Sequence, residues 1–201
     1  MTAATASVIG LAAAPALAVT TWTVKPGGAV TGTAGKTIVT DKTKGLSVTC
    51  TSSAAKGTLK SGKGLAGAGI GTVTSLAFKG CTAMGVTVSV TITGKMPLNA
   101  TAYNATTKVA SMTVTKIHGT IAVSAIPGCS ATIDGTGATA KNGMVKATFS
   151  NKTNTLTVSA KGGNLHIYNP TTACNGAVGN KDAVNFTGAY KFGAKQTITS
   201  P

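Results

Sequence analysis

Arginine and glutamate are both absent from the 201 residues, and only three aspartates accompany eighteen lysines. Without arginine the chain has no guanidinium fork for bidentate recognition of phosphate. Aromatic residues make up 4% of the sequence, too few for a platform that stacks nucleic-acid bases. Sequence-specific nucleic-acid binding is therefore not expected. The scarcity of Glu, Arg and Leu-rich segments also removes most strong helix formers.

No Cys-x-x-Cys pair occurs, although the chain has four cysteines, Cys50, Cys81, Cys129 and Cys174. An even number of widely spaced cysteines in an exported protein indicates two disulfides. Three connectivities are open, and sequential pairing, Cys50–Cys81 and Cys129–Cys174, is favoured because a meander keeps such neighbours close. The alternative is a zinc site with four cysteine ligands, but such sites normally carry their ligands in close pairs. No metal and no cofactor are expected.

Beyond residue 18 no apolar run reaches the roughly 18 residues that a membrane span needs, so no transmembrane segment is expected. Residues 1–18 are Ala-rich and uncharged and end in Ala-Leu-Ala, the pattern of a secretory signal peptide. A short N-terminal core helix is the alternative. Residues 19–201 are then a single secreted, extracellular domain.

Residues 86–92, Val-Thr-Val-Ser-Val-Thr-Ile, alternate apolar and polar side chains with a period of two. This alternation predicts a β-strand with one buried face and one exposed face. Similar alternation recurs along the chain, for example where Val145, Ala147 and Phe149 define one inner face. The pattern predicts an all-β fold: a single antiparallel meander of about 10–12 strands forming a β-sandwich or flattened β-barrel with two disulfides.

Two local irregularities are expected. The apolar positions change parity between Val114 and Ile117, which predicts a β-bulge near Thr115 and Lys116. Residues 52–71 are rich in Gly, Ala, Ser and Lys, a composition that predicts a long loop.

An enzyme is not expected. A carboxylate pair could come only from Asp41, Asp134 and Asp182, and all three lie in or beside predicted turns, where Asp is common. A Ser–His–Asp site would need His118 or His166, and no Gly-x-Ser-x-Gly motif is present. A hydrolase with a cryptic histidine-centred site remains an alternative, because triads can lack sequence motifs.

One polar cluster is a candidate ligand site. Asn164, His166 and Tyr168 are spaced two residues apart, so strand alternation places them on one face, where they could bind a sugar or an anion. The competing interpretation is that these are ordinary surface residues of a strand, and that His118 likewise lies at a surface or rim.

The formal net charge of +15 is the strongest functional signal. It favours weak, salt-sensitive binding to an anionic cell-wall polymer, an acidic polysaccharide, anionic lipid head groups or extracellular DNA. Lysines that only keep the protein soluble and protect strand edges are the competing explanation. A third hypothesis is a structural, adhesive protein that self-assembles through exposed strands, with residues 28–41 as the segment involved.

Several segments resemble a family of small secreted actinobacterial β-rich proteins of uncharacterised function. They are residues 28–35 (GAVTGTAG), 46–53 (LSVTCTSS), 57–62 (GTLKSG), 98–103 (LNATAY), 162–168 (GGNLHIY) and 196–201 (QTITSP). The resemblance implies export from a Gram-positive cell and a β fold. It implies no activity and no functional residue.

Overall fold

The computed structural model describes residues 21–201, which consist of β-strands joined mostly by turns. The signal peptide predicted for residues 1–18 lies outside the described residues. The strands are β1 (Thr21–Lys25), β2 (Gly28–Ala34), β3 (Thr37–Asp41), β4 (Ser47–Leu59), β5 (Gly62–Ala66), β6 (Gly71–Ala83), β7 (Val86–Ile92), β8 (Met96–Asn104), β9 (Val109–Ile117), β10 (Gly119–Val123), β11 (Ser130–Asp134), β12 (Gly143–Ser150), β13 (Thr155–Val158), β14 (His166–Tyr168), β15 (Val184–Phe192) and β16 (Thr197–Thr199). A 3₁₀ helix spans Thr172–Cys174.

Eight of the strands close into a barrel. The order is β6–β8–β9–β12–β13–β15–β2–β4, and β4 pairs again with β6. All the paired strands are antiparallel. The all-β prediction is therefore confirmed, and the barrel, rather than the sandwich, is the architecture that forms.

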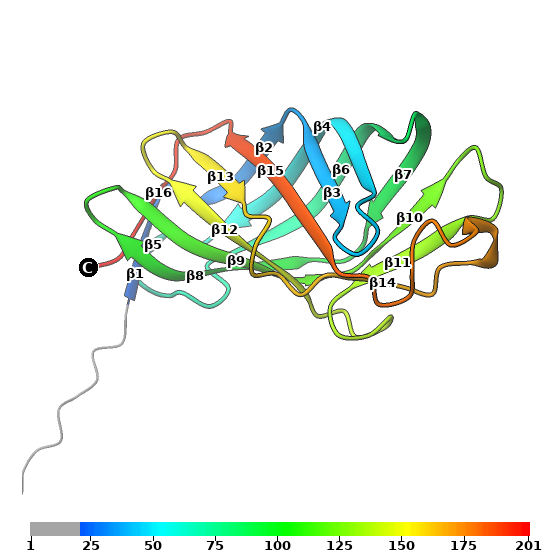
Figure 1. Ribbon diagram of the computed structural model, residues 1–201. Helices are drawn as coiled ribbons and strands as arrows, with labels where there is room; N and C mark the ends of the chain where they lie inside the picture. Colours follow the sequence, from blue (N-terminus) through cyan, green and yellow to red (C-terminus); the bar gives the residue numbers. More distant parts are fainter. Residues whose placement is uncertain (1–20) are drawn as a thin grey trace, which may run out of the picture.

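The barrel is elongated because three strands run along its length and shorter strands follow one another beside them (Figure 1). These three strands are β4, β6 and β15, each of which pairs in turn with two strands that follow one another along the chain. Between them lie β2 and β3, β8 and β7, β9 and β10, β12 and β11, and β13 and β14, each pair end to end. A second closed ring of neighbours consists of β14, β11, β10, β7, β6, β4, β3 and β15. It closes through a bridge between His166 in β14 and Ala183, the residue before β15.

A small three-stranded sheet, β16–β1–β5, lies at one end of the barrel (Figure 1). Its Trp22, Val24 and Ile198 are buried and belong to the same apolar cluster as the barrel core. The sheet therefore closes this end. No helix within residues 21–201 has the length and apolar character to cross a bilayer.

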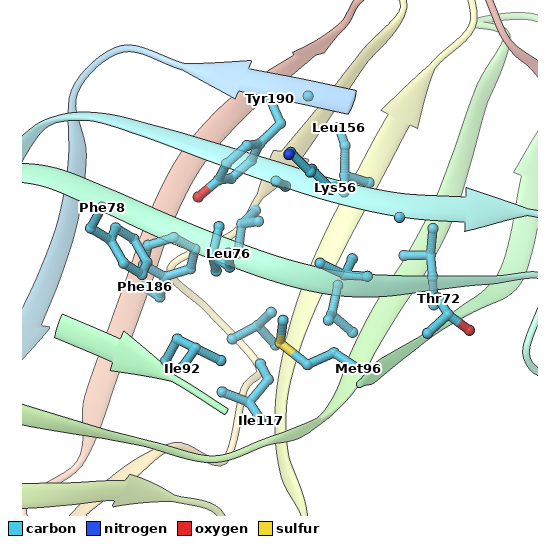
Figure 2. A pocket seen from close by; sticks show the side chains of 18 of the residues that line it. Lys56, Thr72, Leu76, Phe78, Ile92, Met96, Ile117, Leu156, Phe186 and Tyr190 are labelled. Atoms are coloured by element: carbon cyan, nitrogen blue, oxygen red, sulfur yellow. The ribbon is translucent and has the colours of Figure 1, made fainter. Parts of the chain in front are cut away.

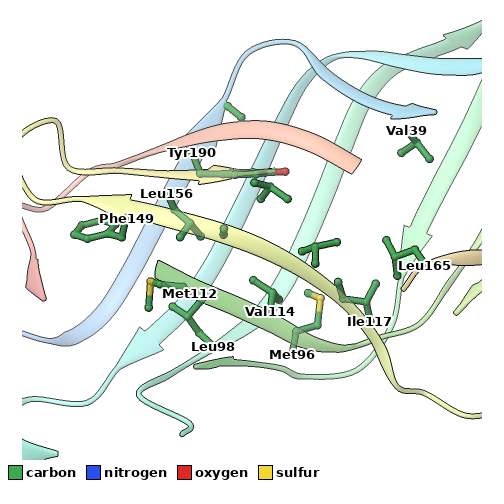
Figure 3. Packing of buried hydrophobic residues seen from close by; sticks show 14 of the residues in the cluster. Val39, Met96, Leu98, Met112, Val114, Ile117, Phe149, Leu156, Leu165 and Tyr190 are labelled. Atoms are coloured by element: carbon green, nitrogen blue, oxygen red, sulfur yellow. The ribbon is translucent and has the colours of Figure 1, made fainter. Parts of the chain in front are cut away.

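The interior is filled by the apolar face of alternating strands. On β12 the buried residues are Val145, Ala147 and Phe149, as predicted, and the lysine and threonine residues between them are exposed. The Phe149 ring packs 5.2 Å from the Phe192 ring, centroid to centroid. Figure 3 shows Phe149 among side chains from β8, β9, β13 and β15.

The β-bulge predicted near Thr115 and Lys116 is confirmed. Along the β9–β12 ladder Val114 pairs with Val145, whereas Ile117 pairs with Gly143, so β9 contains one extra residue between them. Lys116 takes up that residue with a φ of 60°. The bulge returns Ile117 to the interior after the parity change.

The long loop predicted for residues 52–71 is wrong. This stretch forms the second half of β4 and all of β5. Gly57 pairs with both β2 and β6, and a Cβ there would collide with the carbonyl oxygen of Thr72. Because the neighbouring backbone needs this space, glycine marks a close approach of strands here rather than an end of regular structure.

A Gly57→Ala substitution is expected to destabilise the fold by about 1–3 kcal/mol, because the backbone of Thr72 must move to admit the methyl group. Urea unfolding measures the effect. Gly35→Ala is the matched control, since a Cβ at Gly35 meets nothing within 4 Å. Equal stabilities for the two variants would contradict this account of β4.

The two disulfides are Cys50–Cys81 and Cys129–Cys174, which confirms sequential pairing. The first joins directly paired residues of β4 and β6. The second joins the turn before β11 to the 3₁₀ helix. All four sulfurs are consumed, so the alternative of a four-cysteine zinc site is wrong.

Candidate functional site

The three predicted ligand residues do come together, and two of them, His166 and Tyr168, contact the carbonyl group of Gly135. The Tyr168 hydroxyl donates to the Gly135 oxygen over 2.9 Å. The His166 Nδ1 atom lies 3.0 Å from the same oxygen and 2.8 Å from the oxygen of Asn164. Since both partners are carbonyls, Nδ1 carries the proton and donates.

Their polar atoms are largely committed to the backbone. The Asn164 side chain accepts from the Met144 amide over 2.6 Å and donates to the Asn142 carbonyl over 3.3 Å. Tyr168 is 8% exposed. The cluster therefore connects β14 to the segment that leads into β12, which indicates a structural role.

This structural role predicts the effect of Tyr168→Phe. Removing the hydroxyl leaves the buried Gly135 carbonyl with one donor fewer and should cost about 1–2 kcal/mol of unfolding free energy. Thermal or urea unfolding checks the value. A variant with unchanged stability but altered binding to glycans or anions would instead support the ligand-site hypothesis.

A second polar cluster, which the sequence analysis missed, pairs His118 with Asp134. The Nδ1 atom of His118 lies 2.8 Å from Oδ2 of Asp134. The pairing follows from the β10–β11 register, in which Gly119 lies opposite Ile133, so the residues just beyond also face each other. The symmetry of these two strands about their connecting turn is the signal that could have found it.

Asp134 is fully buried and accepts three backbone hydrogen bonds in addition to the one from His118. The donors are the amides of Gly135, Lys141 and Asn142, at 2.6–3.0 Å. Burial by itself raises the pKa of Asp134, but these hydrogen bonds outweigh it and hold the pKa below its usual value. The carboxylate thus stays charged and holds residues 135–142 against β11.

The His118–Asp134 pair has two parts of a hydrolytic triad, an acid and the histidine that it orients. Within residues 21–201 no hydroxyl is hydrogen-bonded to the ring of either His118 or His166. The chemistry of an activated nucleophile needs that contact. The contacts instead indicate a structural role, in which Asp134 joins His118 to the backbone of residues 135–142.

The other two aspartates are buried as well, and their carboxylates accept hydrogen bonds from backbone amides of turns. Asp41 is 3% exposed and accepts from the amides of Thr43 and Lys44 at 2.8 and 3.0 Å. Asp182 is 7% exposed and accepts from the Gly179 amide over 2.6 Å. The predicted role of Asp as a turn former agrees with these contacts, but the sequence offered no sign of the burial.

The outer surface is consequently cationic, and no exposed aspartate balances the lysine charges. All eighteen lysines are exposed, whereas all three aspartates are buried. Across residues 21–201 no lysine forms an ion pair with a carboxylate, and the side-chain partner of Asp134 is His118. Every charged side chain that this part of the chain offers to a partner is therefore an ammonium group.

The fold defines an elongated, eight-stranded antiparallel barrel with a cationic exterior. Comparison of the chain with protein-family models, with curated proteins and with solved structures gave no significant match. The resemblance to secreted actinobacterial proteins stays a prediction.

Proposed function

We propose that the protein is a secreted, non-enzymatic binding protein that attaches to anionic polymers or glycans at the cell envelope or outside the cell. The observation that carries the proposal is the segregation of charge. Eighteen lysines are exposed and all three carboxylate side chains are buried. Such a surface attracts polyanions over a distance of about one Debye length, about 8 Å at physiological salt.

The chemistry of the cations limits how specific this attachment is. Lysine presents a compact, strongly hydrated charge and lacks the rigid fork with which arginine grips phosphate or carboxylate. The lysines also occupy turns and strands all along the chain. We expect weak, salt-sensitive attachment to teichoic acid, acidic polysaccharide or another anionic chain.

Retention on immobilised heparin tests whether the lysine charge is responsible. Acetylation removes the charge of each lysine, whereas reductive dimethylation keeps it and adds similar bulk, so the two modified proteins form a matched pair. The dimethylated protein should bind like the unmodified one and elute below about 0.5 M NaCl, where screening removes simple ionic attachment. The acetylated protein should flow through. Equal retention of both modified proteins would overturn the proposal.

The segment on which the self-assembly alternative depends, residues 28–41, is mostly paired within the barrel. β3 pairs on both sides, with β4 and β15. β2 pairs along its whole length with β4 and, at Gly32 and Thr33, with β15. Within the described part of the chain, residues 28–30 at the start of β2 lack a partner on one edge, so the edge offered to another copy is short, and we expect light scattering to report a monomer.

A further inference from the structure

The barrel interior is not completely filled. A cavity of about 90 Å³ lies inside the wall, and its lining consists almost entirely of hydrocarbon (Figure 2). Buried Met96, Leu98 and Ile117 form part of the lining, and the half-exposed Phe78 and Phe186 pack edge to face with ring centroids 5.9 Å apart. Cavities of this composition stay dry and favour apolar occupants.

The wall beside this cavity contains a seam, a stretch where two neighbouring segments lack ladder hydrogen bonds to each other. β6 pairs with β7 through Thr82 and Ala83, and with β8 through Gly71 to Val73. Between these paired ends, residues 74–81 of β6 and residues 88–95 of the β7–β8 segment are not paired with each other. Both edges of the seam carry half-exposed apolar side chains that line the cavity: Leu76 and Phe78 on one edge, Val90 and Ile92 on the other.

The seam follows from the phase of the two strands. The paired ends share one register, in which Phe78 would lie opposite Thr91. Phe78 points inward, whereas Thr91 is exposed on the outer face. Directly opposite residues of an antiparallel pair must point to the same side. β6 changes phase twice, at a bulge between Val73 and Ser75 and near Gly80, whose φ is 57°. The stretch between these points is therefore out of phase with the β7–β8 segment, and the ladder cannot close there without turning apolar side chains outward.

We propose that this seam is the mouth of a binding site for the hydrocarbon chain of a single-chain amphiphile with an anionic head group. The chain end would lie in the cavity against the buried Met96, Leu98 and Ile117. Each edge of the seam also carries an exposed lysine, Lys79 and Lys95, and neither segment contains an acidic residue. The charge at the rim therefore matches a carboxylate or phosphate left outside.

The cavity volume fits this type of ligand. A cavity of roughly 150 Å³ accommodates benzene, so about 90 Å³ suits the narrower end of an alkyl chain. The remainder of the chain would lie along the seam, covering the half-exposed side chains. Eight-stranded barrels are of the size that holds one small ligand.

Fluorescence titration with cis-parinaric acid tests the proposal. The protein should bind one molecule per chain, and palmitate should displace it. Val90→Trp fills the cavity from the edge of the seam and should weaken binding at least about tenfold. Thr91→Trp places the same ring on the outer face of β7 and should bind like the unmodified protein. Absence of saturable binding, or equal binding by both variants, would overturn the proposal.

Variants with changes only at exposed lysines test the proposal even if Val90→Trp fails to fold. Lys79→Gln combined with Lys95→Gln should weaken parinarate binding by about three- to tenfold, since it removes the rim charges. Lys36→Gln combined with Lys108→Gln removes the same net charge at exposed turn positions elsewhere and should leave binding unchanged. If the two double variants weaken binding equally, the rim lysines have no special role and the proposal fails.

Competition identifies the source of the ligand. Displacement by palmitate alone indicates a free fatty acid, and displacement by a lysophosphatidylglycerol alone indicates a lipid with a phosphate head group. Binding of a Thr/Val-rich strand peptide without any parinarate binding would show that the seam accepts a β-strand instead. Parinarate binding should persist at about 0.5 M NaCl, unlike attachment to heparin, so this proposal and the proposed function fail independently.

Discussion

Replacing Asp134 with alanine should destabilise the protein by about 3–5 kcal/mol, because three backbone amides and His118 then lose their acceptor. Urea unfolding measures the loss. Asp182→Ala is the matched control: Asp182 is also buried but accepts the amide of Gly179 alone, so its loss should be about 1–2 kcal/mol. Equal losses would contradict the account of Asp134.

Asp134 also predicts how stability depends on pH. Its pKa is lower in the folded protein than the ordinary value of 3.8. The unfolded chain therefore binds the proton more readily, and the stability that the carboxylate contributes is fully present above the unfolded pKa. It is lost as the pH falls below about 4 and through the folded pKa. The Asp134→Ala variant should lack this part of the acid dependence, and an unchanged acid limb would contradict the prediction.

Removing both disulfides should have the largest effect. Their sequence separations are 31 and 45 residues. Loop-closure entropy then gives roughly 4 kcal/mol for each bridge, so most of the 5–15 kcal/mol typical of a domain would be lost. The Cys50→Ala/Cys81→Ala and Cys129→Ala/Cys174→Ala variants should each lose about half of the total effect.

Reductant provides the control for the disulfide prediction. The urea midpoint of the unmodified protein should fall when a reductant is added, and that of the variant with all four cysteines replaced should not move. A loss below about 1 kcal/mol for either pair would show that its bridge does not constrain the unfolded chain as the loop-entropy argument requires.

The strands and the bridges could be predicted because their signals are local or pairwise. Alternation in residues 86–92 and 145–149 marks a strand whatever its neighbours are. The bulge at Thr115–Lys116 was visible because the parity change lies within one strand. The sequential disulfides followed from an even number of cysteines and short connections.

The features that escaped prediction depend on which strands become neighbours. Gly57 resembles a loop residue until β6 is known to lie against it. The seam exists because β6 is out of phase with the β7–β8 segment, which neither stretch reveals alone. Burial of the aspartates, and hence the unopposed lysines, likewise depends on turns folding over the carboxylates.

The central claim is that exposed lysines, without surface carboxylates, make this barrel a polyanion-binding protein. Its most direct test is calorimetric binding of a twelve-nucleotide single-stranded DNA, used only as a defined polyanion, between about 50 and 200 mM NaCl. The logarithm of the binding constant should fall linearly with that of the salt concentration with a slope of about −2 or steeper, equivalent to about three or more phosphates, whatever the base sequence. Affinity that is independent of salt, or that depends on base sequence, would contradict the claim.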